Sequence, residues 1–504
     1  MSCILWCLRK LLDLLAYVIY VFYKSYRRQC EFNADLVAVS VTGSDAPVHL
    51  LAKCDSGYSC WQQAAGDLKV ALDNHIYTSD FFYHQTEALR LLKKKNKDNR
   101  YRVDDLPPLP KNPEKHTQVF DEADDRLSTM WQDHPSNYDR ELNAKNIYIR
   151  SEFDDRSPWL LFDNADELKE RITYKFYRYH FRIDRDVILA DPIEVQGFID
   201  EEHGERTYNP MYQGLYDNRD LFIKGLKDLA QDSANEPWTI AELAENHAKL
   251  YSAEVKHRSQ LYYKRREEQR LMIGVFNGWH KPKNDELEFR GDVYEPGDAK
   301  RLLKKVEKEL EADIGWLAQL DRKVFMTYFQ MALQIHKAVA EELYLRYEFQ
   351  LELQNIWYEL QKQDGPMDAA IDYLNAQQGD TIPEKAFEEL LTIFRDTHKA
   401  MKTMLKSAKS MTIPGLQNMP AGQSLRSFLL SADLIDGLSK YERSVSIGWI
   451  NELIGQFREM RRKIDRVHFK SLAGILALQE RIGLECTRRW AKPQPKAKTP
   501  VKAP

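Results

Sequence analysis

Apolar residues recur at helical spacing along most of this 504-residue chain, and residues that break helices are sparse. Glycine and proline number only 21 and 20. Long segments therefore run without interruption, which favours helices over strands. The pattern predicts a mainly α protein, in which a smaller helical N-terminal part precedes a large helical bundle.

Shifts in composition divide the chain into seven predicted regions. They are an apolar helix (1–30), a helical region (31–98), a Pro-rich linker (99–127), a second helical region (128–185), a loop-rich junction with short strands (186–237), a helical domain (238–490) and a disordered tail (491–504). Breaks in the first helical region are expected at 43–45 and 55–57, where glycine and serine cluster. No repeat of fixed period is present, so a solenoid is not predicted.

The C-terminal helices are predicted from caps and periodicity. Thr239-Ile240-Ala241-Glu242 is a capping box that should open a helix running to about Met272, and Thr381-Ile382-Pro383-Glu384 is a second such box. Further helices are expected over 298–312, 315–363 (as one helix or two), 425–441 and 445–489. Their aromatic stripes are typical of a helical core, and the long periodic stretches are also compatible with coiled coil.

The N-terminal segment is apolar but too short to span a bilayer. Its uninterrupted apolar run, Leu14–Tyr23, has about half of the ~20 residues that a spanning helix needs. Tyrosines at helical spacing suit a lipid interface (Tyr17, Tyr20, Tyr23 and Tyr26). We expect membrane association through residues 4–26, with the protein on the cytoplasmic face. The alternative is a helix buried against a larger domain.

Composition argues against several classes of protein. The net charge of −4 gives no field that would attract nucleic acid. Five of the six cysteines lie in the first 60 residues, without a Cys-x-x-Cys pair, so no disulfide framework is expected. The chain has neither a Gly-x-x-x-x-Gly-Lys loop nor a Gly-x-Ser-x-Gly elbow. His84, His247 and His257 lack a histidine partner four residues away, and His180 is expected to be a satisfied helix-end histidine.

Two short segments carry candidate chemistry. Glu31 and Asp35 are four residues apart, so on a helix they share one face. A Glu backed by a carboxylate one turn away can serve as a metal ligand with a supporting partner. Farther along, His134 and Arg140 could hold a developing oxyanion or a substrate carbonyl. The alternative for this second segment is that His134 caps a helix before Pro135 and Arg140 forms a surface ion pair.

These two segments resemble zinc metallopeptidases of the HtpX and CAAX-prenyl-protease type, metallopeptidase family forty-eight. The first segment, Arg28-Gln29-Cys30-Glu31-Phe32-Asn33-Ala34-Asp35 with Thr42-Gly43 following, is similar to that family's third-ligand helix. The second, His134-Pro135 with Arg140 six residues after the histidine, is similar to its Thr-His-Pro-x-x-x-x-Arg motif. Asp133 replaces the usual Thr, and Glu141 replaces the usual Ile.

The resemblance implies a zinc-dependent endopeptidase acting on a protein or peptide substrate. Glu31 would be the third zinc ligand, Asp35 its supporting carboxylate, and His134 and Arg140 would assist the transition state. The region 31–185 would then be the remnant of a metallopeptidase domain, followed by a helical accessory domain.

The other half of such a site, His-Glu-x-x-His, is absent from these 504 residues. A catalytic zinc needs three protein ligands, so we expect the isolated chain not to cleave peptides. An interrupted start that removed an upstream part is the preferred explanation, because the chain opens in an apolar helix without a lead-in. A degenerate family member is the other explanation.

A non-enzymatic function is the alternative to the peptidase. Residues 220–490 are the larger part of the chain and show no catalytic constellation. They could bind a partner protein or organise an assembly at a membrane, as a helical scaffold.

Overall fold

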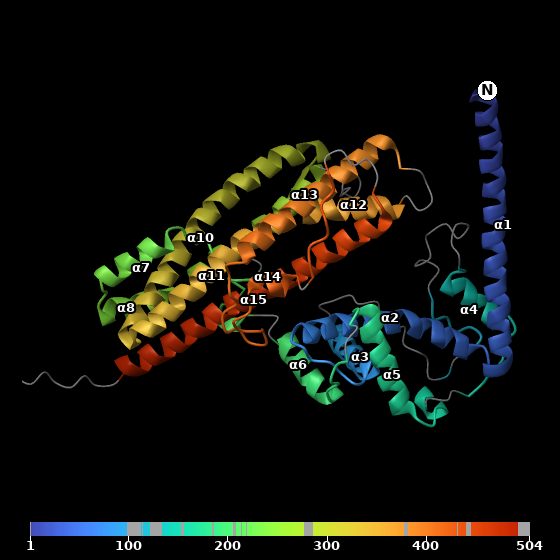
Figure 1. Ribbon diagram of the computed structural model, residues 1–504, viewed down its shortest axis with the longest axis horizontal. Coiled ribbons are helices and arrows are strands. Elements are labelled where there is room, and N and C mark those ends of the chain that lie inside the picture. The colour runs from blue at the N-terminus through green and yellow to red at the C-terminus, as the bar shows by residue number, and fades with distance from the viewer. Residues whose placement is uncertain are drawn as a thin grey trace, which may run out of the picture. The chain divides into compact units, whose positions relative to one another are not determined.

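The structure is a computed structural model that describes residues 2–97, 112, 114–120, 134–152, 156–183, 186–204, 208–212, 214–217, 219–276, 286–376, 382–430, 432–439 and 445–491. It confirms the prediction of a mainly α protein (Figure 1). The chain forms two compact units, Met1–His203 (unit 1) and Gly204–Pro504 (unit 2). Most of the predicted Pro-rich linker and nearly all of the predicted tail lie outside the described residues.

Unit 1 is built around two small apolar cores. Its elements are α1 (Ser2–Thr42), α2 (Asp45–Asp73), α3 (Phe81–Lys97), α4 (Asn137–Lys145), the 3-10 helix η3 (Pro158–Leu161), α5 (Ala165–His180) and α6 (Pro192–Gly204). One core joins α2, α3 and α6, with aromatic side chains of α5 packed against it. The other joins α1, α2 and α4, and it is this second core that positions the candidate site.

The turn between α1 and α2 depends on Gly43. This residue has φ +81°, and a Cβ there would lie 2.5 Å from the Cβ of Ser151. Glycine alone meets both conditions without strain. The predicted break at 43–45 is thus confirmed. The predicted break at 55–57 is wrong, because α2 continues through it while its apolar face packs on the core.

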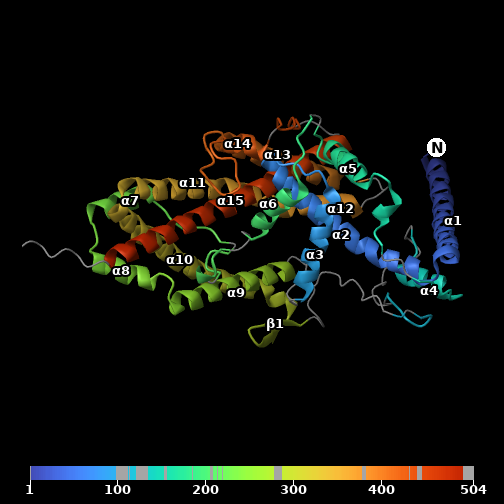
Figure 2. The same cartoon turned by 90° about the horizontal axis from the view of Figure 1, so that it is seen from below.

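Unit 2 is a bundle of long helices. Its elements are η4 (Pro210–Tyr212), α7 (Leu226–Asn235), α8 (Ile240–Lys249), α9 (Ala253–Phe276), β1 (Leu287–Phe289), β2 (Asp292–Tyr294), η6 (Pro296–Asp298), α10 (Ala299–Ile335), α11 (Lys337–Gln361), α12 (Asp364–Ala376), α13 (Glu384–Ala408), α14 (Leu425–Leu429) and α15 (Ile447–Trp490). The strands β1 and β2 form an antiparallel hairpin that Figure 2 shows near the end of α9. Arg290 in its turn pairs with Glu268 of α9 and Glu309 of α10.

Two apolar cores lie along unit 2, and α11 and α15 contribute to both. Leu343 and Ile475 belong to the first core, while Leu353 and Ile464 belong to the second. Figure 1 shows these two helices running side by side, with α10 along part of their length.

Helix boundaries differ from the predicted ones at several positions. The capping box at Thr239 is confirmed, but the helix that it opens ends at Lys249 and α9 begins separately. The stretch 315–363 belongs to two helices, as one of the predicted alternatives had it: they meet at His336, whose backbone is extended and whose Nδ1 accepts from the N–H of Ala338. The predicted break between 298–312 and 315–363 is wrong, because α10 runs from Ala299 to Ile335 without interruption. The junction 186–237 is split between the two units and contains α6 and α7 where short strands were expected.

The helix predicted over 425–441 is wrong. α14 ends at Leu429, and the described residues that follow it are not helical. Side chains of other helices bind their backbone instead: Gln456 accepts from the N–H of Ile435 at 3.1 Å, and His398 Nε2 contacts the carbonyl of Ile435 at 2.7 Å. These tertiary contacts outweigh the local helical preference.

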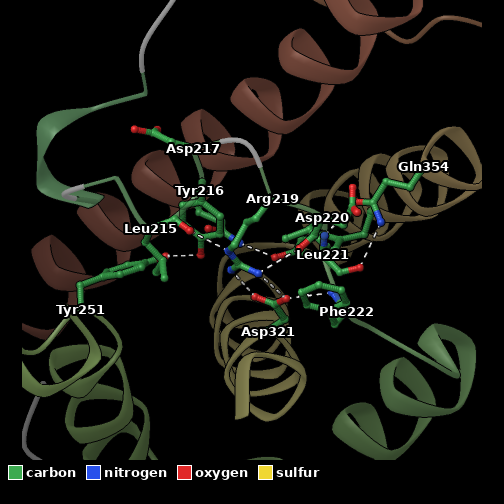
Figure 3. Close-up of polar contacts among 12 residues, drawn as sticks. Leu215, Tyr216, Asp217, Arg219, Asp220, Leu221, Phe222, Tyr251, Asp321 and Gln354 are labelled. Atoms are coloured by element: carbon green, nitrogen blue, oxygen red, sulfur yellow. Dashed lines mark hydrogen bonds and ion pairs between the residues drawn. The ribbon is translucent and has the colours of Figure 1, made fainter. Parts of the chain in front are cut away.

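A buried ion pair ties the start of unit 2 to α10 (Figure 3). Arg219 donates to both carboxylate oxygens of Asp321 at 2.9 and 2.6 Å, and to the carbonyl of Leu215 at 2.7 Å. Asp321 also accepts from the N–H of Phe222 at 2.9 Å. Burial alone would lower the pKa of Arg219, but the carboxylate of Asp321 outweighs that effect and keeps the guanidinium charged.

Candidate functional site

Two carboxylates of α1 face α4. Glu31 and Asp35 lie one turn apart on this face, as their spacing predicts. The side chain of Asp35 is 8% exposed and that of Glu31 is 23% exposed. The contact between the helices therefore holds two acidic groups in a region that is largely closed to water.

The start of α4 determines where Arg140 lies. Ser136 is the N-cap: its Oγ accepts from the N–H of Asp139 at 2.9 Å, and its carbonyl accepts from the N–H of Arg140 at 2.9 Å. Asn143 ties α4 to α1 by donating to the carbonyl of Phe32 at 3.0 Å. Since Ser136 caps the helix, the interpretation of His134 as its cap is wrong.

Arg140 and Asp35 form a bidentate pair. Arg140 Nε donates to Asp35 Oδ2 at 2.8 Å, and Nη2 donates to Oδ1 at 2.6 Å. The hydrogen bonds to Asp35 raise the pKa of Arg140. This planar arrangement orients the guanidinium, so that its Nη1 lies 3.7 Å from Glu31 Oε2.

Glu31 lies between Arg140 and His134. Its Oε1 is in contact with His134 Nδ1, and the imidazole is otherwise 65% exposed. Its Oε2 is buried and has no hydrogen-bond partner among the described residues. A buried carboxylate oxygen without a donor costs free energy, and such atoms in proteins often face a ligand or an ion.

The residues present fit one part of a zinc site. Glu31 Oε2, which accepts no hydrogen bond from the described residues, is of the atom type that binds zinc, but Arg140 Nη1 lies 3.7 Å from it. The imidazole of His134 contacts the other oxygen of Glu31. Within the described ranges, however, no three His, Cys, Asp or Glu side chains are grouped so that they could hold a metal. A catalytic zinc has three protein ligands, so these residues alone do not complete one.

The structure thus brings together all four residues that the sequence singled out. Glu31 and Asp35 come from α1, His134 and Arg140 from a segment about a hundred positions later. Their proximity is observed, whereas their catalytic roles stay predictions. Cys30, next to Glu31, is exposed and free.

Three other histidines considered in the sequence contact side chains of the fold. His84 is buried, with Nδ1 2.8 Å from Gln196 Oε1 and Nε2 2.8 Å from Thr78 Oγ1, and burial lowers its pKa. His180 ends α5 and stacks on Phe176 at 4.8 Å between ring centres. His247 contacts the hydroxyl of Tyr328 at 3.3 Å.

Sequence reasoning missed a second polar cluster on α4. Glu141 was noted only as a departure from the peptidase motif, yet its carboxylate is buried and bonded to Lys145 at 2.7 Å. The spacing of Glu141 and Lys145 is that of an ion pair on a helix, but no sequence pattern indicates that the pair is buried or that it binds backbone groups.

No protein-family model, no curated protein and no solved structure matches this chain. The resemblance to the peptidase family therefore rests on the two short sequence segments and stays a prediction.

Proposed function

We propose that this chain is a zinc metalloendopeptidase component in which Glu31 supplies the third metal ligand. The observation that carries the proposal is the carboxylate of Glu31, held between Arg140 and His134 with one buried oxygen lacking a donor.

Each of the four residues has a distinct task in this proposal. Asp35 holds the guanidinium of Arg140, and Arg140 directs positive charge at Glu31. His134 is exposed enough to reach a substrate carbonyl oxygen and donate a hydrogen bond to it. A bound zinc would supply a water nucleophile of lowered pKa.

The two histidine ligands have to come from a His-Glu-x-x-His segment that these 504 residues do not contain. We therefore expect purified 1–504 to hold less than one zinc per chain and not to hydrolyse casein. If residues 1–504 bound one zinc per chain and hydrolysed casein in a chelator-sensitive way, the assignment of the two histidine ligands to a separate segment would be contradicted.

The decisive experiment uses the protein purified from its own cells, with an antibody against unit 2. Intact mass, zinc content and casein hydrolysis are measured for the wild type, for Glu31→Gln, and for Glu170→Gln, an exposed glutamate of α5. Zinc and activity that are lost in Glu31→Gln and kept in Glu170→Gln would support the proposal. A native species with neither zinc nor activity would overturn it.

A helical scaffold is the second candidate function. In the described part of unit 2, long helices pack around two apolar cores, and no group of side chains there could hold a metal. The scaffold function predicts a phenotype for deletion of 220–490 and none for Glu31→Gln. The opposite pattern favours the peptidase.

We also infer that residues 4–26 bind a membrane surface on its cytoplasmic face. Apolar and tyrosine side chains of α1 are exposed over this range (Leu11, Leu12, Leu14, Leu15, Tyr17, Val18, Ile19, Tyr20, Phe22, Tyr23 and Tyr26). Among the described helices, none has an apolar stretch long enough to cross a bilayer. Leu15→Glu with Phe22→Glu should largely abolish flotation with anionic vesicles, whereas Val41→Glu, at an exposed site farther along α1, should not.

A further inference from the structure

One face of α5 carries positive charge without acidic neighbours along the chain. The stretch 171–182 contains four cationic residues (Arg171, Lys175, Arg178 and Arg182) and no Asp or Glu. Arg171, Lys175 and Arg178 are spaced by four and three residues, so they share one face of the helix, and all three are exposed. The acidic residues of α5 lie before this stretch, in its first two turns. Among the described residues, no carboxylate pairs with Arg171 or Lys175.

The opposite face of α5 is fixed to the rest of unit 1. Thr173 and Tyr177 are buried there. Thr173 Oγ1 accepts from the N–H of Phe81 at 2.9 Å, and the hydroxyl of Tyr177 accepts from the N–H of Thr78 at 2.9 Å. These contacts determine how the helix is turned, so its cationic face stays at the surface of unit 1.

Three exposed apolar side chains precede α5. Leu160 and Leu161 of η3 are 73% and 84% exposed, and Phe162, which follows η3, is 49% exposed. Their neighbour Trp159 is anchored, because its ring centre lies 4.8 Å from that of Phe82 in α3. The fold therefore presents consecutive apolar side chains to solvent, a feature that often marks a binding surface.

An anionic bilayer matches both features of this surface. Acidic lipid headgroups attract clustered Lys and Arg side chains, and the acyl region accepts exposed leucine and phenylalanine. Tyr179, which is 75% exposed and next to Arg178, is a residue type that favours the level of the headgroups. A nucleic acid would match the positive charge, but it would offer no apolar phase to Leu160 and Leu161.

We propose that α5 and η3 form a membrane contact of unit 1 that selects anionic lipid. Arg171, Lys175 and Arg178 bind the headgroups, and Leu160 and Leu161 enter the acyl region. This contact is separate from the one proposed for residues 4–26 of α1, and it does not depend on whether Glu31 binds zinc.

The test uses the full chain with Leu15→Glu and Phe22→Glu, so that α1 contributes little to binding. Sedimentation with an excess of phosphatidylcholine vesicles, prepared with and without phosphatidylserine, measures the bound fraction. We expect weak binding that requires phosphatidylserine. Because the attraction is electrostatic and the surface is exposed, raising the salt concentration should reduce it.

Charge reversal on α5 should weaken this binding. Adding R171E/K175E to the same chain should lower the partition coefficient about tenfold or more, because two attractive charges become repulsive. The matched control is K304E/K308E, which reverses two exposed charges four residues apart on α10 of unit 2 and should leave binding unchanged. Adding Leu161→Ser alone should weaken binding at low and high salt alike, because its contribution is apolar.

The inference is overturned if the chain with the two α1 substitutions does not bind phosphatidylserine vesicles, or if both charge reversals reduce binding equally. Binding of single-stranded RNA in place of vesicles, lost in R171E/K175E, would assign the surface to nucleic acid and would also overturn it. Circular dichroism checks that each variant folds, and R171Q/K175Q takes the place of the reversal if α5 unfolds. Loss of zinc or of peptidase activity would leave all of these measurements unchanged.

Discussion

Both units contain bidentate arginine–aspartate pairs, and Arg219–Asp321 of unit 2 differs from Arg140–Asp35 of unit 1 in what surrounds it. Arg219 and Asp321 of unit 2 are fully buried, at 0% and 1% exposure, and Asp321 also accepts a backbone amide. Arg140 and Asp35 of unit 1 have nearly the same hydrogen-bond lengths, but the arginine is 22% exposed and faces a second carboxylate.

Under the proposed function, the difference separates a pair that stabilises the fold from a pair that orients a residue of the candidate site. Arg219 also donates to the carbonyls of Leu215 and Asp220, and both side chains of its pair are closed to water. Beside Arg140, Glu31 keeps a buried oxygen without a donor. Hydrogen-bond geometry does not distinguish the two pairs, and neither does an unsatisfied neighbour, because Asp220 Oδ1 beside Arg219 is also buried without a hydrogen-bond partner among the described residues. The exposure of the arginine does distinguish them.

The largest effect should come from Arg219→Ala. Removing one partner of a buried pair leaves an uncompensated charge, and we expect a loss of about 3–5 kcal/mol in the free energy of unfolding. Urea titration followed by circular dichroism would measure it. Arg270→Ala, in an exposed pair of α9, should change stability by less than about 0.5 kcal/mol. A loss below about 1 kcal/mol for Arg219→Ala would remove the contrast between the pairs.

A buried histidine should make the stability of unit 2 depend on pH. Burial lowers the pKa of His468 to about 4, and its Nε2, 3.8 Å from Asp220, has no hydrogen-bond partner among the described residues. The unfolded chain binds a proton near pH 6.5, so stability should fall as pH drops from about 6.5 to 4, by roughly 3 kcal/mol at most.

The variant His468→Phe isolates this effect. The variant keeps Asp220. Burial raises the pKa of Asp220, so its contribution to the pH dependence of the unfolding free energy has the opposite sign. The slope of unfolding free energy against pH should flatten in the variant over that range. An unchanged slope would show that His468 is not the responsible group.

Arg140→Ala should cost less than Arg219→Ala. The pair with Asp35 is partly solvated, so we expect a loss of about 1–2 kcal/mol in unit 1. Thermal unfolding measures the change, with Arg90→Ala in an exposed pair of α3 as the control. A loss as large as that of Arg219→Ala would place both pairs in the same structural class.

Glu31→Gln should have the smallest effect on stability, within about 0.5 kcal/mol. Its Oε2 has no donor to lose, and a neutral amide relieves the burial of a charge. Asp35→Asn, measured in the same way, should cost more because it weakens two hydrogen bonds. A strongly destabilised Glu31→Gln would indicate that Glu31 serves the fold rather than a ligand.

Caps and apolar periodicity in the sequence predicted the helices that are stabilised by interactions between residues close in the sequence. The capping box at Thr239 and the apolar periodicity of 445–489 correspond to α8 and to α15, which begins beside its N-cap Ser446. The predicted helix over 425–441 is wrong because side chains of α13 and α15 bind its backbone from distant positions. Such contacts leave no periodic trace in the sequence.

The candidate site was predictable only in part for the same reason. Helical spacing placed Glu31 and Asp35 on one face, but no period links them to Arg140 across more than 100 residues. Family resemblance supplied that connection. For Glu141, helical spacing indicates only the pair with Lys145, and no signal indicates its main-chain donors, the N–H groups of Val119 and Phe120.

Helices α11 and α15 each contribute side chains to both cores of unit 2, and this constrains how the sequence can change in evolution. Each inserted residue turns the rest of a helix by about 100°. An insertion between Tyr347 and Leu353 would therefore keep one core in register and turn the apolar face of α11 away from the other. Length variation among relatives of this chain should accordingly occur in the connections between helices, and α11 and α15 should keep their lengths.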